Sequence, residues 1–308
     1  MILRRTVQRL AARAALAAGL GLAGVAAPMT VGAATAADIF WERAVMSAAD
    51  SRCHLFTPDI TAALLGARAQ ARGAALRAGA GEGSLQDLAD RASRKVEAVP
   101  CRSPDLAIAA ARVRTAFEGW GRIPRMAFPG DVAAWRADRT YSVDGPTWRL
   151  AQAGRVGAQG FTFGLAGRRG ETARLIAVAD FGDGPGPYSA RLLVRDRARA
   201  PGAYLNVLQI STSGRLPLVS RAPPRSAATV FAATGRAAAE RRLLAPGQAS
   251  AIAFQFPAAA AEAIAGLDPR EAVILEFSFM GRSGDIVRTA YVEVGDFAAG
   301  QAFLAAAK

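Results

Sequence analysis

Near residue 140 the hydrophobic periodicity of this chain changes, and no other feature limits its possible folds as strongly. Before that point apolar residues recur every three to four positions, the spacing of one face of an α-helix. After it they alternate with polar residues in short runs bounded by Gly and Pro, which is typical of antiparallel strands. Because strands follow helices and do not alternate with them, the sequence predicts an α+β protein.

Residues 37–139 are predicted to form a helical region. Thr57-Pro58-Asp59 combines a capping residue, a first-turn proline and an early acid, and Ser103-Pro104-Asp105 repeats this start signal. Ser84 with Asp87 predicts a capping box at the start of a further helix, which ends before Pro100. The expected helices span residues 38–51, 57–78, 84–99 and 103–117.

Residues 140–308 are predicted to form an antiparallel, sandwich-like β region with short helices. Gly281-Arg282-Ser283-Gly284-Asp285 should join the last two strands as a hairpin. Two short helices interrupt the strands, over residues 258–265 and 297–307, and Asp296 should cap the second. The expected strands are 161–163, 175–179, 190–194, 204–210, 229–232, 251–256, 273–279 and 286–294.

The first 36 residues have the order of a cleavable secretory signal. A basic start that includes Arg4 and Arg5 precedes an uncharged Ala-rich and Gly-rich run, which ends at Pro28. Small residues then give a cleavage site after Ala36 or Ala37. The alternatives are an uncleaved membrane anchor and a twin-arginine signal. We expect a periplasmic or secreted protein with no transmembrane segment after cleavage.

Cys53 and Cys101 are the only cysteines, and an even number in an oxidising compartment favours pairing. Closing a loop of roughly 48 residues stabilises the fold by about 4 kcal/mol in the chain-entropy model. The bridge should clamp the end of the first helix to the turn before the fourth. A zinc site made of both cysteines and His54 is the alternative, although adjacent ligands bind one ion awkwardly and no second histidine exists.

The charge of the chain restricts its partners. The formal charge is +13 at pH 7, and Arg supplies nearly all of it, because Lys95 and Lys308 are the only lysines. An exported basic protein meets anionic envelope components, so the expected partner is a protein, glycan or anionic lipid head group and not nucleic acid. No cofactor is expected, since the G-x-G-x-x-G spacing at residues 19–24 lies in the signal with no strand before it.

Most catalytic schemes lack the residues they need. With His54 as the only histidine, imidazole-dependent triads have one candidate, which lies beside the expected disulfide. A pair of carboxylates is enough for glycan hydrolysis, and Glu276 and Glu293 lie within expected strands. Alternation with apolar neighbours should turn both side chains towards solvent. Asp180 and Asp183 are interpreted as turn residues, because they supply too few ligands for calcium.

A segment between the two regions mixes aromatic rings with guanidinium groups, the combination that stacks on sugars and binds phosphate or carboxylate. The alternative is that its rings are buried where the helical region docks on the sheet, with the arginines paired to acids such as Asp131 and Asp138. The candidate ligand-binding residues are Trp120, Arg122, Arg125, Phe128, Trp135 and Arg136.

Two runs of sequence carry a resemblance to known families. Residues 124–131 (PRMAFPGD) and 287–297 (VRTAYVEVGDF) resemble segments of exported bacterial proteins that have no assigned function. The ending, a strand hairpin followed by Gly-Asp-Phe and a short Ala-rich helix, is similar to the close of the invasion-associated locus B family. Neither resemblance implies an activity, and the paired cysteines expected in that family are absent from this part of the chain.

These patterns together predict an envelope protein that acts as a non-enzymatic binding or structural module. The competing prediction is a carboxylate-based hydrolase of envelope glycan. A third interpretation, contact with anionic lipid or lipopolysaccharide, predicts binding that weakens as salt is added.

Overall fold

The computed structural model describes residues 35–182, 186–205 and 216–305. The predicted signal, residues 1–36, lies outside these ranges apart from Thr35 and Ala36. Helix α1 (Ala36–Cys53) begins here, with the Thr35 side chain accepting a hydrogen bond from the Asp38 amide while the Asp38 carboxylate accepts from Thr35. The predicted cleavage sites therefore fall in the first turn of this helix.

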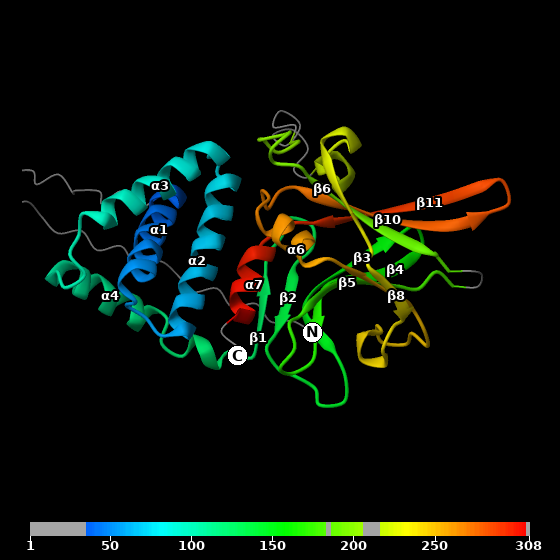
Figure 1. The fold of residues 1–308 in the computed structure, drawn as a ribbon, viewed down its shortest axis with the longest axis horizontal. Coiled ribbons are helices and arrows are strands. Elements are labelled where there is room, and N and C mark those ends of the chain that lie inside the picture. Colours follow the sequence, from blue (N-terminus) through cyan, green and yellow to red (C-terminus); the bar gives the residue numbers. More distant parts are fainter. Residues whose placement is uncertain (1–34, 183–185, 206–215, 306–308) are drawn as a thin grey trace, which may run out of the picture. The chain divides into compact units, whose positions relative to one another are not determined.

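Helices α1, α2 (Pro58–Arg77), α3 (Glu82–Glu97) and α4 (Pro104–Ala116) form the N-terminal part, as predicted (Figure 1). The start signals of α2 and α4 are confirmed, since each begins at its proline. The capping box predicted at Ser84 is wrong, because α3 begins at Glu82 with Gly81 as its N-cap. Glu82 forms an ion pair with Arg195, a long-range contact that a local capping pattern does not include.

The predicted disulfide is present between Cys53 and Cys101, whose Cα atoms are 5.6 Å apart. It joins the last residue of α1 to the turn between α3 and α4. Buried Ala49, Val96 and Leu106 lie in a cluster beside it, so the bridge closes a small core of its own.

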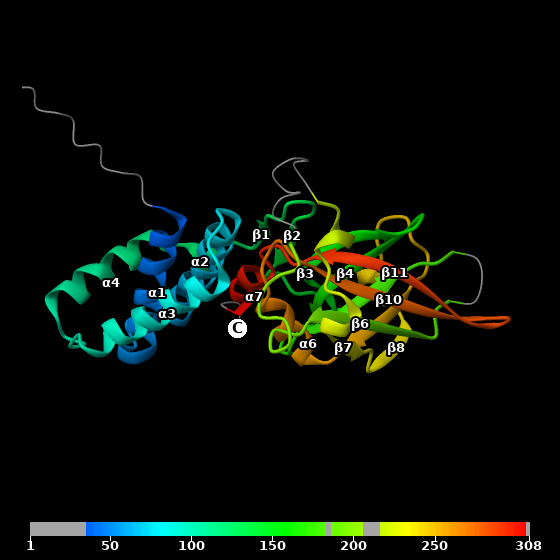
Figure 2. The same ribbon diagram turned by 90° about the horizontal axis from the view of Figure 1, so that it is seen from above.

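The rest of the chain forms two antiparallel sheets, with strand orders β1-β2-β3-β4-β5-β9-β8 and β11-β10-β6-β7. Strands β10 and β11 lie over β3 and β4, and β11 contacts β3 directly (Figure 2). The strands are β1 (Arg125–Phe128), β2 (Trp135–Asp138), β3 (Thr147–Val156), β4 (Gln159–Gly167), β5 (Arg174–Ala179), β6 (Ser189–Arg195), β7 (Ala228–Ala232), β8 (Gly235–Ala238), β9 (Ile252–Phe256), β10 (Ala272–Gly281) and β11 (Gly284–Glu293).

The sheet extends further towards the N-terminus than predicted. Strands β1 and β2 fall within residues 37–139, which were assigned to the helical region, yet they form one edge of the larger sheet. Each has only four residues, too few to show alternation clearly, and arginines and aromatic rings are mixed within the segment. The strand predicted over 204–210 lies mostly outside the described residues.

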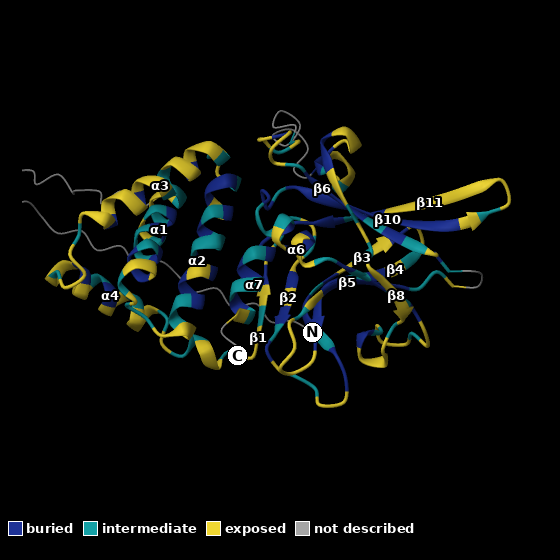
Figure 3. Cartoon of the chain, viewed as in Figure 1, coloured by how far each residue is buried: buried dark blue, intermediate teal, exposed yellow. Residues whose placement is uncertain are grey.

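Helix α7 (Phe297–Ala305) connects the helical part to the sheets, because it packs against α2 on one side and β2 on the other (Figure 1). Its buried Phe297 and Phe303 join the core between the two sheets, together with Trp135 and Phe163. Helix α6 (Ala258–Ala265) covers one end of β5 and β6. Buried residues follow these contacts, whereas the far end of the β10–β11 hairpin is exposed (Figure 3).

Candidate functional site

A cleft of about 540 Å³ lies where the helical part meets the sheets. One wall is the face of α2 that carries Arg68 and Arg72, and α3 contributes Glu82 and Leu85. The opposite wall comes from the turn after α6 and from the residues that lead into α7. Arg197, just beyond β6, lies at this side of the cleft, and Phe40 of α1 also lines it, so the cleft is lined by residues from six separate parts of the chain.

Three arginines line the cleft without a carboxylate partner. Arg68 and Arg72 are half-buried and lie one turn apart on α2, whereas Arg197 is exposed. Arg72 Nη1 donates to the Leu267 carbonyl at 3.0 Å, and a Cβ at Gly266 would lie 3.0 Å from Arg197 Nη1. Among the described residues, no Asp or Glu oxygen lies within 4.0 Å of these three guanidinium groups.

Burial lowers the pKa of the Arg68 guanidinium. It also lowers the pKa of Arg72. The negative charges of Glu82 and Asp268 oppose this shift, and the positive charges of Arg197 and Arg195 add to it. Arginine nevertheless stays protonated in proteins. The cleft therefore holds positive charges that are partly desolvated and only weakly compensated, a condition that a bound anion relieves.

The two acids of the cleft are already paired. Glu82 accepts from Arg195 Nη2 at 2.8 Å, and Asp296 accepts from Arg77 Nη2 at 3.0 Å. Burial raises the pKa of Asp296, although Arg77 opposes the shift, while Asp131 and Glu293 add to it. The carboxylates thus belong to internal ion pairs, and the unpaired charge of the cleft is positive.

Arg195 is the centre of a buried ion network behind this cleft. Its side chain has no exposed surface and forms two bonds to Glu271, at 2.7 and 2.8 Å, besides the bond to Glu82. Burial alone would lower the pKa of Arg195, but its bonds to Glu271 and the charges of both acids outweigh that effect and raise it. The network ties α3 to the sheet and bonds the Glu82 carboxylate to Arg195, with none of the three cleft arginines in ion-pair contact with it.

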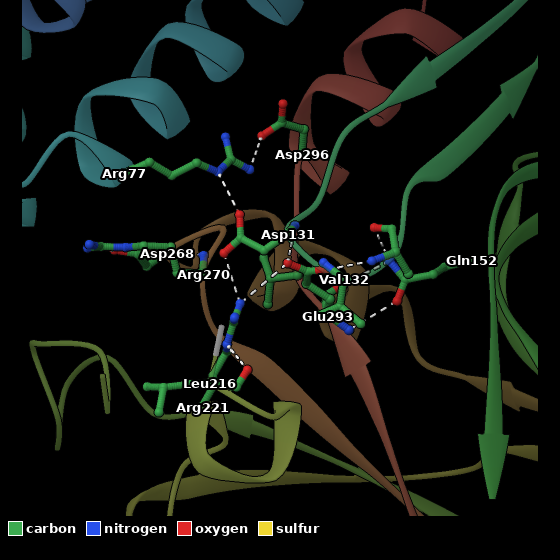
Figure 4. Close-up of polar contacts among 12 residues, drawn as sticks. Arg77, Asp131, Val132, Gln152, Leu216, Arg221, Asp268, Arg270, Glu293 and Asp296 are labelled. Atoms are coloured by element: carbon green, nitrogen blue, oxygen red, sulfur yellow. Dashed lines mark hydrogen bonds and ion pairs between the residues drawn. The ribbon is translucent and has the colours of Figure 1, made fainter. Parts of the chain in front are cut away.

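A second network surrounds Asp131 in the β1–β2 loop (Figure 4). Asp131 lies between Arg221, at 2.9 Å, and Arg77, at 3.6 Å. Glu293 accepts hydrogen bonds from the backbone amides of residues 131–133, at 2.6 to 2.8 Å. This carboxylate is fully buried, so its predicted exposure to solvent is wrong.

Glu276 is also buried, contrary to prediction, and pairs with Arg191 at 3.0 Å and with Arg225. The predicted alternation holds, because Leu275 and Phe277 face the core. However, the outer face of β10 is covered by the segment that contains the 3₁₀ helices η2 (Leu218–Arg221) and η3 (Arg225–Ala227). Both candidate catalytic carboxylates are thus internal ion-pair partners, and neither lines the cleft.

The aromatic and arginine segment is divided by the fold. The rings of Phe128 and Trp135 are buried in the core. Trp120 packs against this core, and the centroid of its ring lies 5.3 Å from that of Phe303. The arginines of the predicted site, Arg122, Arg125 and Arg136, are exposed, and Arg125 pairs with Asp138 at 2.7 Å. The segment therefore presents guanidinium groups to solvent without the rings of Phe128 and Trp135 beside them.

The remaining candidate ligands are separate from the cleft. Exposed His54 ends α1 in the left-handed conformation, with φ of 49°. Asp180 accepts a hydrogen bond from the Gly182 amide at 2.9 Å, which is a turn contact, and Asp183 lies outside the described residues. Within the described ranges, no group of three or more His, Cys, Asp or Glu side chains is arranged to hold a metal ion.

No protein-family model matches this chain, and neither the curated proteins nor the solved structures include a significant match to it. Of the helices in the part that the structure describes, none combines the length and the apolar character needed to cross a membrane. The cleft must therefore be interpreted from its own residues. Sequence reasoning missed Arg68 and Arg72, although charged residues spaced by four on an Ala-rich helix face were a usable signal. No local pattern pointed to Arg197.

Proposed function

We propose that this protein is an exported, non-enzymatic binding module of the cell envelope, and that the cleft between α2, α3 and α7 binds an anionic envelope component. One observation carries the proposal: Arg68, Arg72 and Arg197 line the cleft without a carboxylate partner in the part of the chain that the structure describes, whereas both acids of the cleft are paired. Guanidinium groups bind carboxylate and phosphate through charge-assisted, often bidentate hydrogen bonds. A concave site with a few converging polar groups is the usual form of a ligand pocket.

A periplasmic or secreted location is part of this proposal. It is supported by the basic and then apolar N-terminus and by the Cys53–Cys101 disulfide, which is compatible with an oxidising compartment. Cell fractionation and N-terminal sequencing of the natural protein test this part. Recovery from the cytoplasm with Met1 still attached would contradict it.

The binding proposal is tested by co-sedimentation of the oxidised protein with purified envelope fragments at low and high salt. We expect the wild type to co-sediment, with less bound as salt increases. The double variant Arg68→Gln/Arg72→Gln and the single variant Arg197→Gln should lose most of this binding. Arg197 is exposed, so its replacement leaves the buried structure unchanged.

The matched control is Arg122→Gln/Arg136→Gln, which removes the same charge from exposed positions of the aromatic segment. It should bind like the wild type. Equal loss in both double variants would show that net charge alone drives binding, and greater loss in the control would move the site to the aromatic segment. Either result overturns the assignment of the cleft.

A second candidate, a carboxylate-based glycan hydrolase, is favoured by one feature of the same cleft. Asp296 has a raised pKa, as a general acid requires, and Glu82 lines the cleft with it. Release of reducing ends from envelope glycan, abolished in both Asp296→Asn and Glu82→Gln, would support hydrolysis. Binding without release of products would exclude it.

A further inference from the structure

A second hollow of about 370 Å³ continues from the cleft along the helical part. It lies between α1 and α3 and is closed on one side by α2. Leu65, Arg68 and Ala89 line both the cleft and this hollow, so the two spaces lie side by side at these residues. The two hollows are therefore adjacent, and together their linings run from the turn after α6 to α1.

Arginines follow the linings of both hollows. Arg197 and Arg72 lie at the end near Gly266 and Leu267, Arg68 lies where the two hollows adjoin, and Arg52 lines the far end. Arg52 Nη1 donates to the carbonyls of Val96 and Val99, and among the described residues it has no carboxylate within 4.0 Å. Glu97, which also lines the far end, is the acid of that hollow.

The length of this row excludes a single small anion as the full ligand. Residues four apart on a helix have Cβ atoms about 6 Å apart, so Arg68 and Arg72 can both contact one anionic group. Arg52 extends the row from α2 to the end of α1. An anion that contacts all four arginines must carry several charges along a chain.

Apolar surface accompanies the arginines. Leu65 is 44% exposed where the two hollows adjoin, and exposed Pro201 lines the cleft. Such surface suits a ligand with C–H faces between its charges, and planar carboxylates match the guanidinium fork. We propose that the natural ligand is an acidic polysaccharide with repeating uronate carboxylates, which lies along Arg197, Arg72, Arg68 and Arg52. This inference rests on the proposed function and names its ligand class.

The test is calorimetric titration of the oxidised protein with galacturonate monomer, trimer and hexamer. We expect the hexamer to bind at least about tenfold more tightly than the trimer, because it reaches both hollows. Arg72→Gln should weaken both oligomers. Arg52→Gln should weaken the hexamer and leave the trimer unchanged, whereas Arg52→Lys should retain part of the hexamer affinity.

A second variant does not disturb any internal hydrogen bond. Leu65→Asp places a negative charge on an exposed side chain at the junction of the hollows, and it should lower hexamer affinity at least about tenfold. The matched control is Ile108→Asp, on α4 at 54% exposure, which should bind like the wild type. Equal effects of the two substitutions would overturn the path through Leu65.

The other outcomes separate the two proposals. Equal affinity for trimer and hexamer would overturn the extended path while leaving anion binding in the cleft intact. Binding of polyphosphate as tightly as the hexamer, or of a neutral glucose hexamer, would overturn the uronate class. Absence of galacturonate binding by a protein that still co-sediments with envelope fragments would overturn this inference alone, whereas absence of both would overturn the proposed function as well.

Discussion

The buried pair between Arg195 and Glu271 gives the sharpest prediction about stability. Both side chains have no exposed surface, and two bonds of 2.7 and 2.8 Å join them. Glu271→Gln would leave the fully buried Arg195 charge with a neutral amide in place of its buried partner, and with Glu82 as its one remaining carboxylate among the described residues. Removing one partner of a buried ion pair costs about 3 to 5 kcal/mol of unfolding free energy, so we expect a loss in that range.

Two further variants isolate the cause of this loss. Glu82 is 15% exposed and forms one bond to Arg195, so Glu82→Gln should cost less, about 1 to 3 kcal/mol. Replacing both buried charges, as in Arg195→Met/Glu271→Leu, leaves only the partly exposed Glu82 carboxylate without its partner and should restore most of the stability. Urea unfolding followed by circular dichroism measures each value, provided that the m-value is unchanged. The reasoning would be refuted if Glu271→Gln lowered the unfolding free energy by less than about 1 kcal/mol, or if the double variant were less stable than Glu271→Gln.

Three other predictions concern stability. Replacing Cys53 and Cys101 by Ala should lower the unfolding free energy by about 4 kcal/mol, because a loop that spans 48 positions is opened; a urea midpoint equal to that of the oxidised protein would contradict this. Phe303→Ala should cost about 3 to 5 kcal/mol, since the ring is fully buried against Trp120 and beneath the Arg139 guanidinium; a loss near 1 kcal/mol would argue against this packing. Burial raises the pKa of Asp296, so the folded protein holds that proton more tightly than the unfolded chain, and stability should decline as pH rises from about 3.9 through the folded pKa. In Asp296→Asn the urea midpoint should no longer fall over this pH range. A pH profile equal to that of the wild type would contradict this assignment.

Local signals predicted the helices and most strands, because helix starts and strand alternation are set by residues that are close together in the sequence. The starts of α2 and α4 follow from a proline after a capping residue, and the structure places them there. The long strands β10 and β11 were predicted from their alternation. The start of α3 was missed because Glu82 reaches Arg195, which is distant in the sequence.

The burial of Glu276 and Glu293 could not be predicted from alternation. Alternation gives the side of the strand on which each side chain lies, but not whether that side is covered. The cover comes from residues 216–227, whose arginines pair with both carboxylates. The cleft could not be predicted either, because it also depends on long-range packing. Arg197 and Arg72 line the same cleft only because the helical part packs on the sheets through α7.

The measurement that tests the central claim most directly is nuclear magnetic resonance of the arginine side chains during titration with galacturonate hexamer. The Nε–Hε signals of Arg68, Arg72 and Arg197, assigned by single substitutions, should shift in a saturable way with one common affinity. The signals of Arg122, Arg125 and Arg136 should remain unchanged. Shifts confined to these last three, or small unsaturable shifts of every exposed arginine, would contradict the account.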